Sequence, residues 1–271
     1  IMDTITLKVH AKVTLTLEIT GVNDRGYHEL DMICCSVSPC DEVRVKKAEE
    51  TTVTMDGKRA GEENTAYRAA AEVLKECGSA LCVDIRKGIP SGAGLGGSSA
   101  DASAVFRAAV ELGLIDGNTA EKLCVKVGSD VVYMMRGGYC RLRGEGEKIT
   151  PLGEINFRLA LVQKEVGAST AEVYRSYDAS PVKGLGVPAV LRGEKYYNVL
   201  ENAAVAKCPS ISEVKDRLYG IYGNACMTGS GSAVFAIVPE YADEASFKEK
   251  FSDCVFAELV DTVPCGIEII S

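Results

Sequence analysis

The chain has 271 residues, of which 46% are hydrophobic and 25% are charged, a balance typical of a globular protein with a full core. Its formal net charge is −8, which argues against a nucleic-acid partner because such proteins concentrate positive charge on one face. No apolar run reaches the roughly 18 residues that a membrane span requires, and no signal-peptide pattern opens the chain. We therefore expect a cytoplasmic protein without a membrane partner.

Eleven cysteines raise the question of a metal site or a disulfide framework. Their spacing favours neither, because Cys34 and Cys35 are adjacent and the sequence has no Cys-x-x-Cys pair. Most of the others lie in apolar stretches. We predict buried free thiols in a reducing compartment.

Strand and helix patterns alternate in the first part of the chain. Alternating apolar and polar side chains, separated by turn residues, predict strands at residues 5–19, 32–37, 42–46, 51–55 and 81–85. Ser38-Pro39 is expected to separate the second strand from the third, and Asp56-Gly57 to close a hairpin. Apolar residues at helical spacing predict helices over 64–77, 100–109 and 120–127.

A second region begins near residue 156. Its predicted strands are residues 157–162, 255–260 and 265–270, together with a Gly/Ser turn and strand over 226–238. Its predicted helices are residues 170–177, 212–222 and 242–251, with Ser212 as the N-cap of the second. Because strands and helices intermix throughout, we predict an α+β fold in two domains, residues 1–153 and 154–271.

A glycine-rich run at residues 92–97 lies between a predicted strand and a predicted helix. Glycine lets the backbone take positive φ and bring its N–H groups against a ligand. The start of a helix adds unpaired donors and partial positive charge, so the combination suits a polyphosphate. No Gly-Lys-Ser or Gly-Lys-Thr follows, which excludes a Walker A loop, and the spacing does not match a dinucleotide fingerprint. From the residues alone, a tight structural turn remains the alternative.

Other candidate residues are individually ambiguous. Asp130 precedes an apolar run, where a desolvated carboxylate needs a cation or a donor, but it could also be a helix N-cap. Lys12 lies in the first predicted strand, where the alternative is an ordinary exposed lysine. The turn at residues 25–28 carries one of two histidines and could be a plain surface turn. The Gly/Ser turn at 228–232 is either a hairpin or a wall of a site.

Taken in order, these motifs resemble the GHMP kinase superfamily. Its loop, Pro-x-x-x-Gly-Leu-x-x-Ser-Ser, matches residues 90–99. Matching blocks elsewhere are residues 11–13, 26–30, 128–131, 169–174 and 227–232. The Gly26-Tyr27-His28 turn is similar to that of the branch whose acceptor is a cytidyl-diphosphate sugar alcohol. The resemblance implies an N-terminal domain like domain 2 of ribosomal protein S5 and a ferredoxin-like C-terminal domain.

The resemblance also implies a role for each matched position. Asp130 would accept the proton of the acceptor's 2-hydroxyl group, and Lys12 would hold that carboxylate ionised. The phosphoryl donor would be ATP, with a Mg²⁺ ion reached by Ser98 or Ser99. The nucleotide would contact Lys87, Pro90, Ser91, Gly92, Ala93, Gly94, Leu95, Gly96, Gly97, Ser98, Ser99 and Ala100. The cytidyl-diphosphate substrate would contact Thr14, Tyr27, His28, Thr170 and Tyr174.

Three positions depart from the pattern of that branch. Thr14 stands where it usually has Asn, Val132 where it has Pro, and Arg25 where it has Asp. Competing interpretations are a superfamily kinase acting on homoserine or mevalonate, a nucleotide-binding regulator without catalysis, and a dinucleotide-dependent oxidoreductase. The absence of Rossmann spacing disfavours the last. The sequence carries no heptad pattern from which to infer an oligomeric state.

Overall fold

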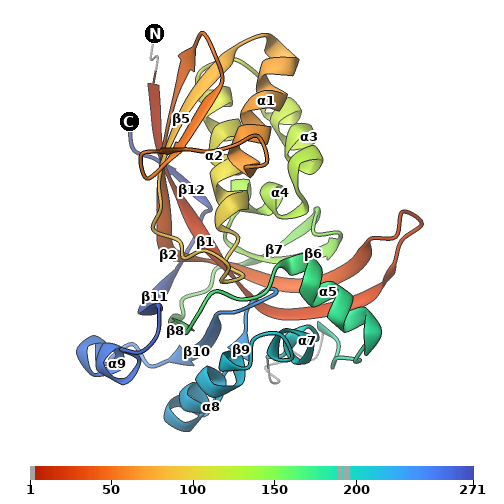
Figure 1. Ribbon diagram of the computed structural model, residues 1–271, viewed down its shortest axis with the longest axis vertical. Coiled ribbons are helices and arrows are strands. Elements are labelled where there is room, and N and C mark those ends of the chain that lie inside the picture. The colour runs from red at the N-terminus through yellow and green to blue at the C-terminus, as the bar shows by residue number, and fades with distance from the viewer. Residues whose placement is uncertain (1–3, 188–190, 192–195) are drawn as a thin grey trace.

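The computed structural model describes residues 4–187, 191 and 196–271. Two long antiparallel strands, β1 (Thr4–Val22) and β2 (His28–Ala48), cross most of the molecule (Figure 1). Their register pairs Thr4 with Lys46 at one end and Val22 with His28 at the other. The predicted first strand is confirmed, and it extends slightly at both ends because β2 pairs with it along its whole length.

The predicted break at Ser38-Pro39 is wrong, because β2 continues through it. Residue His10 of β1 pairs with Cys40, and the next residue, Ala11, pairs with Val37. The register shift leaves Ser38 and Pro39 without partners in β1, as an irregularity in a continuous strand. A bulge tolerates proline because the residue there does not need to donate a ladder hydrogen bond.

Helices and further strands complete the first part of the fold. The strands are β3 (Thr52–Met55), β4 (Lys58–Arg59) and β5 (Ala80–Arg86). The helices are α1 (Thr65–Cys77), α2 (Gly97–Glu111), α3 (Gly117–Val127) and α4 (Ser129–Arg136), gathered on one side of β1 and β2 (Figure 1). The predicted hairpin is confirmed, with positive φ at Asp56 and Gly57. Helix α1 begins after the predicted boundary residue Asn64, its N-cap, and ends at Gly78, where φ is +73°.

The remaining elements add strands to the sheet of β1 and β2 and form a second layer beside it. The strands are β6 (Tyr139–Gly144), β7 (Lys148–Gly153), β8 (Arg158–Gln163), β9 (Cys226–Met227), β10 (Val234–Val238), β11 (Phe256–Val263) and β12 (Ile267–Ile269). The helices are α5 (Thr170–Ala179), α7 (Glu201–Val205), α8 (Ser210–Tyr222) and α9 (Glu244–Lys250). Strand β11 pairs with both β8 and β2, and β12 pairs with β1. The division of the chain after residue 153 stays a prediction.

One predicted helix boundary in this layer is wrong. Helix α8 starts at Ser210, so Ser212 lies inside its first turn instead of capping it. The residue at the N-cap is Pro209, whose φ of −60° already suits a helix start and explains the earlier beginning.

The α+β fold is as predicted, and so is the absence of disulfides among the cysteines. All eleven cysteines lie in the described part of the chain, and none forms a disulfide. Six of them are buried, while Cys77 is exposed. Within the described ranges, no helix combines the length and the apolar character needed to cross a bilayer.

Candidate functional site

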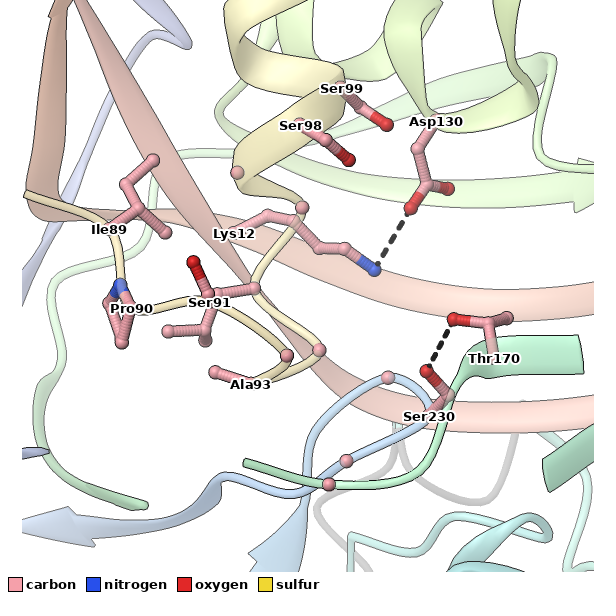
Figure 2. Close-up of a pocket in the computed structure, with 18 of the residues that line it drawn as sticks. Lys12, Ile89, Pro90, Ser91, Ala93, Ser98, Ser99, Asp130, Thr170 and Ser230 are labelled. Atoms are coloured by element: carbon pink, nitrogen blue, oxygen red, sulfur yellow. Dashed lines mark hydrogen bonds and ion pairs between the residues drawn. The ribbon is translucent and has the colours of Figure 1, made fainter. Parts of the chain in front are cut away.

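A cleft of about 680 Å³ lies where the glycine-rich loop meets β1, the start of α4 and two segments of the second layer (Figure 2). Lys12 contributes from β1 and Asp130 from α4. Residues 89–99 and 166–170 and the turn at 229–231 form further parts of its wall. The Gly/Ser turn predicted as either a hairpin or a wall therefore lines the cleft.

The glycine-rich loop is fixed through its carbonyl oxygens. The backbone N–H of Lys12 donates to the Leu95 oxygen at 3.0 Å, and that of Ser232 donates to the Gly92 oxygen at 3.1 Å. Because the loop is held through its carbonyl oxygens, its backbone N–H groups remain available to a ligand. The loop can therefore bind an anion through its backbone N–H groups, which a tight turn alone does not require.

Positive φ angles at the glycines let the loop pass close to other backbone. Gly94 has φ of +77°, and a Cβ there would lie 2.4 Å from the Thr228 carbonyl oxygen. Helix α2 starts directly after Gly96, which also has positive φ and provides no side-chain cap. The first N–H groups of that helix have no partner within the helix, so they point a partial positive charge toward the loop. Ser98 is exposed in this first turn.

Lys12 and Asp130 meet at the cleft although they lie far apart in the sequence. Lys12 Nζ is 3.4 Å from Asp130 Oδ2 (Figure 2). The lysine side chain is only 6% exposed, whereas that of Asp130 is 31% exposed. Asp130 is the second residue of α4, whose N-cap is Gly128. The exposed-lysine and N-cap alternatives are therefore both wrong.

The Lys12 ammonium is buried but well supplied with acceptors. Burial by itself would lower the pKa of Lys12, but the charges of Asp130 and Cys34 and a hydrogen bond to Asp130 outweigh it, so the pKa is raised. Lys12 also donates to Thr14 Oγ1 at 2.9 Å. Thr14 is fully buried, so its hydroxyl group contacts the lysine and does not reach open cleft. Its backbone N–H donates to Thr228 Oγ1 at 2.8 Å.

Lys87 lies in the wall of the cleft, but its ammonium is already paired. It contacts the buried carboxylates of Asp41 and Asp101, the second at 2.7 Å. A phosphate or ribose contact from Lys87 would have to share the ammonium with both carboxylates. Its role as a direct nucleotide contact stays a prediction.

An aromatic cluster adjoins the cleft on the side of α5. The ring centroids of His28 and Tyr174 are 4.8 Å apart, and His28 Nε2 is 2.7 Å from Asp178 Oδ1. Tyr27 is 59% exposed. Thr170 begins α5, and its hydroxyl group lies 2.9 Å from that of Ser230 (Figure 2). Thr170 and Tyr174 line the cleft itself, while Tyr27 and His28 lie beyond this wall.

Comparison with known proteins agrees with this geometry. The family model described as GHMP kinases N terminal domain matches residues 64–139, and that described as GHMP kinases C terminal matches residues 183–256. A 4-diphosphocytidyl-2-C-methyl-D-erythritol kinase of Desulfitobacterium hafniense is 37% identical over 88% of each chain. One of Caldicellulosiruptor saccharolyticus is 33% identical over 98% of each. The chain belongs to the 4-diphosphocytidyl-2-C-methyl-D-erythritol kinase family.

Solved structures place this kinase family member in the same fold. A crystal structure of 4-(cytidine 5'-diphospho)-2C-methyl-D-erythritol kinase is 30% identical, with a TM-score of 0.77 over 95% of this chain and 98% of that one. A homoserine kinase of Cytophaga hutchinsonii is 17% identical with a TM-score of 0.67, over 100% of this chain and 98% of that one, and shows a shared fold alone. The predicted resemblance to the GHMP kinases is confirmed, and the oxidoreductase alternative is excluded.

Ala100, a predicted nucleotide contact, and Arg25, a departure from the pattern of the family, both contact other residues of the protein. Ala100 is fully buried and its N–H donates to the Gly96 oxygen, so it supports the glycine-rich loop from behind. Arg25, one of the three departures, places its guanidinium 5.5 Å from the centre of the Tyr27 ring and pairs with Glu145. It therefore supports the ring that we expect to meet the substrate.

Three carboxylates of this kinase were not predicted to act at the site. They are Asp41 and Asp101, which hold Lys87, and Asp178, which contacts His28. Asp101 alone carried a signal in the sequence, because it is a carboxylate within an otherwise Ala-rich, apolar helix. In the part of the chain that the structure describes, no three His, Cys, Asp or Glu side chains form a metal site.

Proposed function

We propose that this chain transfers the γ-phosphoryl group of ATP to the 2-hydroxyl group of 4-diphosphocytidyl-2-C-methyl-D-erythritol, a step of non-mevalonate isoprenoid precursor biosynthesis. The observation that carries the proposal is the Lys12–Asp130 pair, at 3.4 Å, beside the glycine-rich loop. The names of relatives more than 30% identical over most of the chain support the choice of acceptor. Eleven cysteines without a disulfide among them fit a reducing compartment such as the cytoplasm.

Asp130 acts as the general base. Its carboxylate is partly exposed to the cleft, so it can accept the proton of an acceptor hydroxyl group while that oxygen attacks phosphorus. Lys12 keeps a positive charge beside it, which stabilises negative charge on the attacking oxygen. Thr14 fixes the position of the lysine ammonium.

The glycine-rich loop binds the donor phosphates. Backbone N–H groups of residues 92–99 and the start of α2 supply donors and partial positive charge, which an acidic protein must provide locally for an anionic nucleotide. The exposed hydroxyl group of Ser98, or that of Ser99, is placed to contact a Mg²⁺ ion that would neutralise phosphate charge.

The aromatic cluster binds the cytidyl end of the acceptor. Tyr27 offers an exposed ring, and Tyr174 and His28 pack against each other at the edge of the cleft. Such rings stack on a nucleobase, and Thr170 lies between them and the Gly/Ser turn where it can contact the diphosphate. This end of the site distinguishes the proposed acceptor from homoserine or mevalonate, which carry no base.

A panel of acceptors tests the function. The protein is incubated with ATP, Mg²⁺ and, separately, 4-diphosphocytidyl-2-C-methyl-D-erythritol, homoserine or mevalonate, and ADP release is measured. We expect turnover with the first alone. Turnover with a plain alcohol and none with the cytidyl compound would favour another kinase of the superfamily. No turnover with any acceptor, despite ATP binding, would favour a regulator.

A substitution tests the assignment of the base. In Asp130→Asn the side chain keeps its size but cannot accept the proton, and one general base contributes about 10²–10⁴-fold in rate. We expect kcat to decrease by about 10²–10⁴-fold. Near-normal turnover by this variant would remove Asp130 from the mechanism.

A further inference from the structure

The Lys87 ammonium lies between two buried carboxylates at the back of the cleft. It is 2.7 Å from Asp101 Oδ2 and contacts Asp41 Oδ2. The Asp41 side chain is fully buried, that of Asp101 is 3% exposed, and that of Lys87 is 16% exposed. Two buried carboxylates share one ammonium, so the cluster carries excess negative charge whenever both are ionised, within a protein that we expect to bind an anion.

These three residues come from the two ends of the glycine-rich loop and from the strand beneath it. Asp41 belongs to β2, and its Oδ1 accepts the backbone N–H groups of Gly88 at 2.7 Å and Ile89 at 2.8 Å. It thereby fixes the chain where it enters the loop. Asp101 lies in α2, just past the loop, and Lys87 links it to the entry. The cluster thus joins entry and exit in one connected set of hydrogen bonds.

The cluster is costly for the folded protein. Burial is the main reason that the pKa of Asp101 rises to about 7, the Asp41 charge adds to it, and Lys87 offsets only part of the increase. Asp101 Oδ1 has no hydrogen-bond partner although it is buried. A buried ion cluster is often no more stable than an apolar replacement. A role in stability alone therefore does not account for it.

We propose that Asp101 and Asp41 are positioning residues that hold the two ends of the glycine-rich loop through Lys87, and so set the spacing of the backbone N–H groups that receive the phosphates of ATP. The inference rests on the proposed function. It gives Asp101 no contact with the nucleotide.

The direction in which the affinity for ATP changes separates this positioning role from a purely electrostatic effect. Removing the Asp101 charge brings the site closer to neutral, so Coulomb attraction alone would tighten the binding of ATP. Losing the link between the loop ends would weaken it. Asp101→Ala removes both the charge and the acceptor, whereas Asp101→Asn removes the charge and keeps an acceptor for Lys87.

The experiment measures KM for ATP, KM for the acceptor, kcat, and the Kd of ATP by calorimetry without acceptor. We expect Asp101→Ala to raise KM and Kd for ATP about tenfold, the effect of one lost hydrogen bond to a charged group, and Asp101→Asn to raise them less. The KM for the acceptor should not change. Glu111→Gln, at the far exposed end of the same helix, is the matched control and should behave as wild type.

ATP affinity in Asp101→Ala that is unchanged or tighter would overturn the proposal. So would equal effects of Asp101→Ala and Asp101→Asn, or a fall in kcat with unchanged KM. Thermal unfolding checks that each variant is folded, and if Asp101→Ala is not, Asp101→Asn alone decides by the direction of its shift in Kd. If wild type binds ATP but phosphorylates no acceptor, the proposed function fails while the binding arm still tests the positioning role.

Discussion

The hydroxyl group of Thr14 should matter for catalysis although Thr14 does not line the cleft. In Thr14→Val a methyl group replaces the oxygen that accepts from Lys12 Nζ at 2.9 Å, and the rest of the side chain keeps its shape. Lys12 is 5% exposed, so water does not readily replace the lost acceptor. Asp130, at 3.4 Å, is then its remaining acceptor from the site.

A hydrogen bond to a charged group contributes about 1.5–3 kcal/mol when its partner is left buried. If about 2 kcal/mol of this is lost in the transition state, kcat falls about 30-fold, because 1.4 kcal/mol is a factor of ten. The KM for ATP should stay the same, since the glycine-rich loop is attached to the backbone of Lys12 and not to its side chain.

Steady-state kinetics over both substrates, with urea unfolding of the same preparations, measures these effects. Thr14→Ser keeps an acceptor at the same place and is the control, expected within about threefold of wild type in kcat. Wild-type kcat and stability in Thr14→Val would refute the argument that this hydroxyl group positions the ammonium.

Three further predictions follow from other parts of the site. Gly94→Ala should lower the free energy of unfolding by more than about 2 kcal/mol in urea titrations, because φ is +77° and the new Cβ would lie 2.4 Å from the Thr228 carbonyl oxygen. Gly113→Ala is the control, since Gly113 has positive φ but no close neighbour, and it should lower the free energy of unfolding by less. Equal losses in the two variants would contradict the steric argument. Asp178→Ala should raise KM for the cytidyl acceptor about threefold to tenfold without changing KM for ATP, because His28 loses its hydrogen bond to Asp178. An unchanged KM for the acceptor would exclude a role of Asp178 in positioning His28. The folded-state pKa of Asp101, raised by burial to about 7 from 3.8, means that the folded protein binds this proton more tightly, so its contribution to stability falls as pH rises from about 4 to 7. As pH rises from 5 to 8, the free energy of unfolding of Asp101→Asn should therefore increase relative to that of wild type, measured by urea unfolding. A difference between the two proteins that does not change with pH would contradict this prediction.

Local sequence patterns predicted the elements that carry the site. The glycines before an Ala-rich run indicated both the loop and α2, because backbone freedom and helical spacing are properties of neighbouring residues. The predicted break at Ser38-Pro39 is wrong because the effect of a proline depends on how its strand pairs with the neighbouring strand. Only the register with β1 shows that these two residues lie in an irregularity.

Contacts between distant segments set the limit of sequence reasoning. The meeting of Lys12 and Asp130 was expected from family resemblance, since nothing near either residue indicates the other. The same holds for the ion pair of Asp41 and Lys87. Asp41 lies in β2, and Lys87 directly follows the neighbouring strand β5. Pairing of buried charges depends on the folded arrangement, and spacing along the chain does not encode it.

The attachment of β12 to β1 has a consequence for biosynthesis. The strand that carries Lys12 is synthesised well before β12, so Leu7 and Val9 find their partners Ile269 and Ile267 only after that later segment has emerged from the ribosome. Until then, this edge of the sheet lacks these partners. A nascent chain stalled before residue 267 would lack these bonds, and an extension fused after them would lie directly beside the strand that carries Lys12.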